Sequence, residues 1–178
     1  MGIPTLIGSA HTPSNASSVD ITSGIDSTYD EYMFVFTDIN PATDAQNFQF
    51  QVNVDGQSGF NETITSTAFY AQHRENDASN ALEIHGSFDQ AEGTSYQHIA
   101  AEVGNGADES CAGILHLFRP SNTTYTTQFW SRMNTNTGIR SWEDYVSGYI
   151  NTTAAIDEIE FKVNSGTFDA VIQMYGIA

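Results

Sequence analysis

The chain has 178 residues and a mass of 19.4 kDa, a length that suits one domain able to bury a core without disulfide bonds. Five Lys and Arg residues stand against 22 Asp and Glu residues, so the formal net charge is −17. Nucleic acid and anionic membrane surfaces are bound by clustered cations, so we expect neither as a partner. Cys111 is the single cysteine, which excludes a disulfide within the chain.

The first 18 residues are mostly small and polar and predict an N-terminal arm. Its apolar residues Ile3, Leu6 and Ile7 are candidates for docking contacts, and the alternative is a frayed terminus. Alternation of apolar and polar residues begins at Val19, and no linker interrupts the chain after that point. Residues 19–178 are therefore expected to form one domain.

Two strong strand signals lie in the first third of this domain. Residues 32–36 form a short apolar run, which predicts a strand buried on both faces. From Phe48 to Val54 apolar and polar residues alternate, which predicts a strand with one face on the core. Asp55 and Gly56 then supply a turn.

The middle of the chain is less uniform. Residues 64–70 form a weaker strand candidate. Residues 96–103 place apolar side chains at helical spacing, which leaves one short helix open here. Residues 111–118 and 125–133 have strand character and are separated by turn residues, so they predict a hairpin.

The C-terminal part predicts three further strands. Residues 142–150 form one, weakened by Gly148. Residues 159–163 and 168–175 alternate in polarity around the turn at 164–166 and predict a second hairpin. About eight to ten short strands with almost no helical periodicity predict an all-β, antiparallel sandwich or barrel.

No group of residues predicts catalysis or a bound metal. Glu158 and Glu160 share one face of a strand, as the carboxylates of a glycosidase do, but solvated acids on an amphipathic strand are the preferred interpretation. The five histidines lack metal-ligand spacing. Residues 105–109 offer oxygen ligands for calcium, and a solvated turn is preferred there. We therefore expect a chain that is not an enzyme and has no cofactor.

Aromatic residues in the last third of the chain offer a second kind of site. Trp130 and Trp142 are a candidate glycan platform, with Tyr145 and Tyr149 near them in sequence. Aromatic faces bury apolar area against sugar rings. Packing in the core or at a subunit interface is the preferred interpretation of these four residues.

Three segments carry motifs of a known kind. Residues 153–177 contain an Ile-x-x-Ile-x-Phe strand, a Ser-Gly-x-Phe turn and a final Tyr-Gly-Ile. This segment resembles the closing hairpin of small jelly-roll virion proteins of tailed bacteriophages of the marine or cyanobacterial type. Residues 21–29 and 113–120 are similar to the first strand and the middle hairpin of such proteins. The resemblance implies a jelly-roll β-sandwich in a virion assembled in the cytoplasm of a bacterial host.

The resemblance also implies a role and partners. The first hypothesis is a capsid decoration or cement protein that binds major capsid or tail subunits and forms homo-oligomers, with a trimer favoured. The alternative is a tail-fibre or tail-associated protein that attaches to a host surface glycan. A polysaccharide-degrading enzyme is the weaker alternative.

Overall fold

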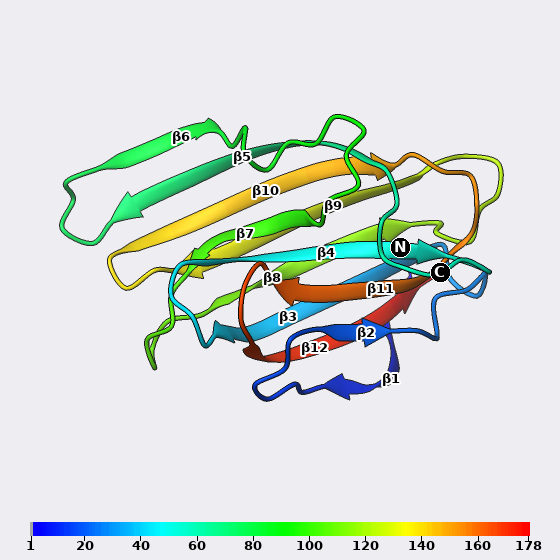
Figure 1. Cartoon of the computed structure of the whole chain (residues 1–178), viewed down its shortest axis with the longest axis horizontal. Coiled ribbons are helices and arrows are strands. Elements are labelled where there is room, and N and C mark those ends of the chain that lie inside the picture. The colour runs from blue at the N-terminus through cyan, green and yellow to red at the C-terminus, as the bar shows by residue number, and fades with distance from the viewer. Residues whose placement is uncertain (1) are drawn as a thin grey trace.

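The computed structural model describes residues 2–178 and consists of two antiparallel sheets (Figure 1). The larger sheet has eight strands, in the spatial order β1 (Thr5–His11), β12 (Phe168–Ile177), β3 (Glu31–Pro41), β8 (Cys111–Phe118), β9 (Thr127–Asn136), β10 (Arg140–Ile150), β5 (Ile64–Arg74) and β6 (Asn80–Ile84). The smaller sheet has four, in the order β2 (Val19–Ile21), β11 (Ile156–Val163), β4 (Gln46–Val54) and β7 (Gln97–Val103). The described residues form no helix, which confirms the all-β, sandwich-like prediction. They therefore contain no helix that is long and apolar enough to cross a membrane.

The structure has twelve strands, whereas the sequence predicts eight to ten. Strands β1 and β6 are two of those that the sequence does not indicate, and both lie at edges of the larger sheet. Most of their side chains are exposed or half-buried, so they lack the buried periodic face that signals a strand in a sequence.

The helix considered for residues 96–103 is wrong, because this segment is strand β7. Its pairing with β4 shifts twice, between Gln46 and Phe48 and between Phe48 and Gln49. Each shift places an additional residue on the β7 side, as a β-bulge does. The bulges break the period of two and leave Ile99, Ala100 and Ala101 all buried, which produces the helix-like spacing.

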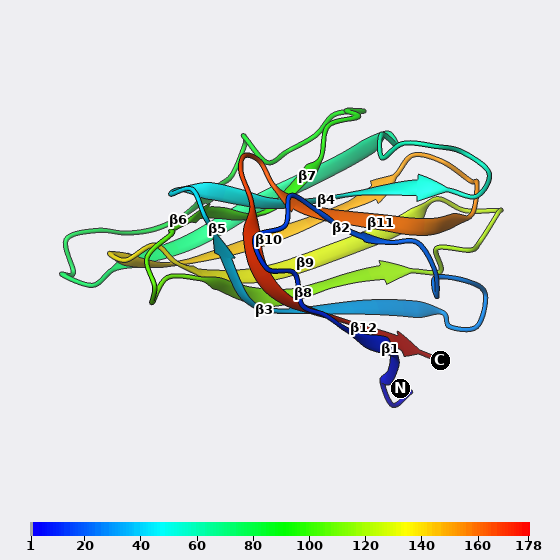
Figure 2. The same cartoon turned by 60° about the horizontal axis from the view of Figure 1, so that its bottom comes forward.

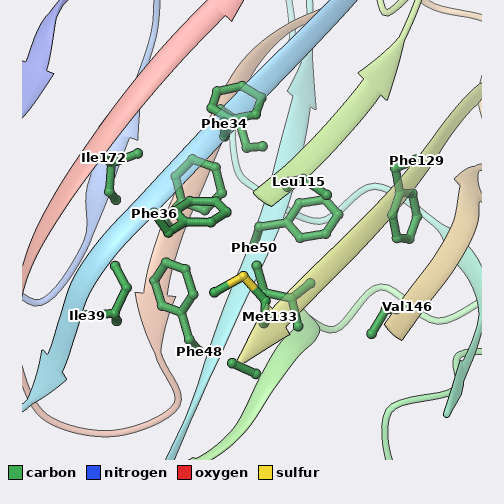
Figure 3. Packing of buried hydrophobic residues seen from close by; sticks show 14 of the residues in the cluster. Phe34, Phe36, Ile39, Phe48, Phe50, Leu115, Phe129, Met133, Val146 and Ile172 are labelled. Atoms are coloured by element: carbon green, nitrogen blue, oxygen red, sulfur yellow. The ribbon is translucent and has the colours of Figure 1, made fainter. Parts of the chain in front are cut away.

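Buried phenylalanine rings from both sheets form the centre of the core (Figure 3). Phe36 of β3 lies 5.2 Å from Phe48 of β4 and 5.1 Å from Phe161 of β11, ring centroid to centroid, in edge-to-face geometry. Each fully buried ring of this kind contributes about 1.5–3 kcal/mol. Because the rings come from opposite sheets, their packing joins the two layers.

One charged residue lies inside this apolar layer. Asp144 of β10 is fully buried and accepts hydrogen bonds from the Ala101 amide of β7 at 2.8 Å and from the Trp142 indole nitrogen at 3.1 Å. Its Oδ1 also lies 3.0 Å from Nδ1 of His85, in the loop after β6. A buried carboxylate thus links β10 of the larger sheet to β7 of the smaller one and to this loop.

Residues 5–11 of the N-terminal segment form strand β1 of the larger sheet. Strand β1 pairs with β12, with Thr5 opposite Gly176 and Leu6 opposite Tyr175. Farther along, Ala16 and Phe168 exchange two backbone hydrogen bonds. The segment therefore follows the outer side of β12.

Candidate functional site

The outer face of the eight-stranded sheet carries the candidate site, because the four-stranded sheet covers the inner face (Figure 2). The register places Trp130 of β9, Ser147 of β10 and Thr67 of β5 in one row across the outer face. Gln128 and Tyr149 are opposite each other in the next row. Directly paired residues of neighbouring strands point to the same side of a sheet, so the five residues form one surface.

A shallow groove of about 620 Å³ lies over these two rows. Trp130 and Tyr149 supply its aromatic walls, and each remains 36% exposed. The small side chains of Ser147 and Thr67 leave the space between the larger residues open. Binding sites for small molecules typically enclose about 300–1,000 Å³, so the groove has the dimensions of a ligand site.

The indole of Trp130 is held in place from one side. His116 stacks on it with ring centroids 4.3 Å apart and planes 12° from parallel. Nδ1 of His116 in turn forms a hydrogen bond with the Glu31 carboxylate. A ring supported in this way loses little side-chain entropy when a ligand covers its other face.

Gly148 supports the groove from beneath. Its position on β10 points toward the core, where a Cβ atom would lie 2.9 Å from the Phe129 ring and even closer to the Thr65 carbonyl oxygen. Glycine is therefore required here by close packing, although it weakens the strand signal in the sequence. The close approach of β5 and β10 keeps Ser147 and Thr67 adjacent in the groove.

The groove has no charged side chain in its lining, although the chain has a net charge of −17. The nearest charged residues on β9 and β10 are Arg132 and Glu143, which form an ion pair with each other. The Arg132 guanidinium also lies 5.6 Å from the centroid of the Tyr145 ring. The electrostatic character of the groove is thus neutral, with hydroxyl, amide and aromatic groups.

The predicted pair of Trp130 and Trp142 does not form one platform. Trp142 faces the core, where its ring centroid lies 4.6 Å from that of Tyr70 and its indole nitrogen bonds Asp144. Trp142 is opposite Thr135, a buried residue, whereas Trp130 is opposite the exposed Ser147. The two tryptophans therefore lie on opposite faces of the sheet, and the expected burial of Trp142 is confirmed.

The two tyrosines named with the tryptophans have different surroundings. Tyr145 stacks on Phe69 of β5, with centroids 4.7 Å apart and nearly parallel planes. Tyr149 lines the groove beside Gln128. The sequence indicated Trp130 and Tyr149 but offered no signal for Gln128, Ser147 and Thr67, because isolated polar residues of this kind are typical of any exposed strand face.

The candidate docking residues of the N-terminal segment separate into two groups. Ile3 and Leu6 are exposed, whereas Ile7 is partly buried and packs against the core. Part of the Ile7 side chain is thus occupied by contacts within the chain. Ile3 and Leu6 remain free at the edge of the sheet.

The acids of β11 lie on the outer side of the smaller sheet and have partners. Glu158 accepts a hydrogen bond from the Asn53 amide at 2.9 Å, and Glu160 accepts one from the Tyr96 hydroxyl. Burial raises the pKa of Glu160 above its ordinary value, and the opposite carboxyl of Asp20 raises it further. Glu158 and Glu160 are not part of the groove at Trp130 and Tyr149.

Residues 105–109, considered for calcium, surround an amide group. The Asn40 Nδ2 donates to the carbonyl oxygens of Gly106 at 3.1 Å and Glu109 at 2.6 Å, so these potential ligands are already satisfied. The Glu109 carboxylate accepts a hydrogen bond from the Gly106 amide at 2.7 Å. Within residues 2–178 no group of three or more His, Cys, Asp or Glu side chains is arranged to hold a metal ion.

Comparison with known proteins adds no family to these observations. No protein-family model matches the chain, and no curated protein matches its sequence.

Proposed function

We propose that this chain is a noncatalytic structural protein of a tailed-bacteriophage virion, a jelly-roll sandwich that binds neighbouring subunits as a capsid decoration protein. The motifs of residues 153–177 support the phage assignment through their resemblance to phage jelly-roll proteins. The observation that carries the docking role is the position of exposed apolar side chains at both edges of the larger sheet.

Each edge of the sheet offers two large exposed side chains. At the β1 edge, Ile3 is 88% exposed and Leu6 45%. At the β6 edge, Leu82 is 72% exposed and Ile84 71%. Each of these strands pairs with one neighbour only, and an edge strand with apolar side chains is a template for contact with another chain.

The two edges are far enough apart to contact different partners. Seven strand spacings of about 4.8 Å separate β1 from β6, which corresponds to roughly 34 Å across the sheet. Figure 1 shows these strands at opposite borders of the molecule. A protein that bridges neighbouring subunits of a shell needs two separated contact surfaces of this kind.

The energy available at one edge is modest. Complete burial of two Leu or Ile side chains contributes about 3–6 kcal/mol before the cost of association is subtracted. A dissociation constant of about 1 mM already requires a net 4.1 kcal/mol. Stable retention therefore depends on simultaneous contacts at both edges and on homo-oligomerisation, for which the resemblance favours a trimer. The acidic surface keeps unbound copies from associating with one another nonspecifically.

Copy number and edge variants test this proposal in the phage that encodes the chain. We expect hundreds of copies per purified particle, and a strong reduction when Leu82 and Ile84 are both replaced by serine. Tyr125→Ser is the matched control, because Tyr125 is equally exposed but lies in the loop between β8 and β9. A protein absent from purified particles, or an edge variant retained at the copy number of the wild type, would refute the docking role.

A further inference from the structure

We infer that the groove between Trp130 and Tyr149 is a binding site for a neutral saccharide. This inference concerns a ligand of the outer sheet face, and it does not depend on the docking role proposed for the two edges. It rests on the aromatic walls, the unpaired polar groups and the charge of the groove.

The aromatic walls fit the apolar faces of sugar rings. Trp130 is supported by His116 on one side and keeps part of its surface open, and Tyr149 provides the second wall. The C–H groups of a pyranose ring pack on such aromatic faces through burial of apolar area, and the phenol hydroxyl adds a polar group.

The polar groups of the groove are free to bind. Within the described residues, the side chains of Gln128, Ser147 and Thr67 form no hydrogen bond with another protein group. Farther along β9 and β10 on this face, by contrast, Asn134 donates a hydrogen bond to Ser141 at 3.0 Å, and Arg132 bonds Glu143. An amide and hydroxyls can both donate and accept hydrogen bonds, which matches the hydroxyl groups of a saccharide.

The charge of the groove selects a neutral ligand. A phosphate or carboxylate group would find no cation in the lining and would approach a molecule of net charge −17. A cationic ligand would find no carboxylate in the lining to pair with. An uncharged, hydroxyl-rich ring is the ligand class that uses all groups present.

Tryptophan fluorescence measures this binding directly. The chain has two tryptophans, and because Trp142 is buried, quenching by acrylamide reports mainly on Trp130. We expect at least one of maltohexaose, cellohexaose, mannohexaose and chitohexaose to protect Trp130 with a dissociation constant of about 1 mM or tighter. Polygalacturonate, an anionic comparator, should give no protection.

Variants then locate the site by calorimetric titration with the saccharide that protects Trp130. Trp130→Ala and Tyr149→Ala should each weaken binding about tenfold or more, the loss of roughly 1.4 kcal/mol expected for one aromatic partner. Tyr125→Ala, an exposed aromatic outside the groove, should leave the affinity unchanged. If Trp130→Ala unfolds, Ser147→Tyr fills the groove from an exposed position and should abolish binding.

Three results would overturn the inference. They are the absence of protection by all four neutral oligosaccharides, stronger binding of polygalacturonate than of any neutral oligosaccharide, and unchanged affinity in the folded groove variants. None of these results bears on incorporation into particles, because the edge residues Leu82 and Ile84 are not part of the groove.

Discussion

Removal of the buried carboxylate of Asp144 is predicted to weaken the attachment between the two sheets. The Asp144 Oδ2 accepts the hydrogen bond from the Ala101 amide, and Oδ1 accepts the one from the Trp142 indole and lies within hydrogen-bond distance of His85 Nδ1. Asp144→Asn keeps one oxygen and places an NH2 group against one of these donors. Asp144→Ala leaves all three groups without their partner.

The magnitudes follow from the number of groups left unsatisfied. A buried donor without a partner costs about 1–3 kcal/mol, so Asp144→Asn should lower the free energy of unfolding by about that amount. Asp144→Ala leaves all three groups without a partner, so it should lower the free energy of unfolding by more, about 3–5 kcal/mol. Stability of a domain is typically about 5–15 kcal/mol, so the alanine variant should lose a substantial part of it.

The chain contains a matched control for this measurement. His73 and Asp77 form the same kind of contact, Nε2 to Oδ1 at 2.9 Å, on the surface. Asparagine tolerates the left-handed backbone of Asp77, whose φ is 57°, so Asp77→Asn should change stability by less than about 0.5 kcal/mol. Urea unfolding followed by circular dichroism gives both values. Equal effects of Asp77→Asn and Asp144→Asn would refute the reasoning that burial determines the cost.

Three further predictions concern single positions. Glu160→Gln should stabilise the fold at pH 7 by about 0.2–1 kcal/mol, because it removes one of two like charges opposite each other. Because the pKa of Glu160 is raised in the folded state, ionisation of Glu160 opposes folding as the pH rises through that pKa. The stability gained by Glu160→Gln should therefore disappear below the ordinary pKa of 4.5. Urea unfolding at pH 4 and pH 7 checks this, and an equal gain at both pH values would contradict it. Burial raises the pKa of the Cys111 thiol, so Cys111 should react with a thiol reagent only after denaturation. Rapid labelling of the native protein would show that Cys111 is not buried. Gly148→Ala should lower the free energy of unfolding by about 1–3 kcal/mol, because the added Cβ collides with β5. Gly86→Ala, at a position open to solvent, should leave stability unchanged. Thermal unfolding measures both variants, and equal melting temperatures would disprove the packing argument.

Strand positions with a strong alternating pattern were predictable from the sequence. The pattern at Phe48–Val54 falls within β4, and the C-terminal hairpin corresponds to β11 and β12. In β11 and β12 about one side chain in every two is buried, so the period of the sequence is the period of the structure. In β4 the polar residues Gln49, Gln51 and Asn53 are buried as well, so the expectation that only one face of this strand is covered was wrong. Where bulges interrupt that period, as in β7, the sequence pattern left a helix open that the structure does not contain.

The candidate site was predictable only in part. The sequence offered Trp130 as a candidate for a glycan platform, with Tyr149 near it, because aromatic faces can bind sugar rings. Thr67 precedes Ser147 by 80 residues, and only the pairing of β5 with β10 brings them together. Single serine and threonine residues do not predict such a pairing, because whether they form a site depends on the residues of the neighbouring strand.

The sequence by itself determined the layered all-β architecture, since hydrophobic periodicity selects strands and their buried faces. Only the tertiary structure decided which residues share a face. The short connection between β9 and β10 sets a register in which Trp130 is opposite Ser147 and Trp142 opposite Thr135. A slip of one residue in that register would have brought both tryptophans to the same side, because successive side chains of a strand point to opposite faces.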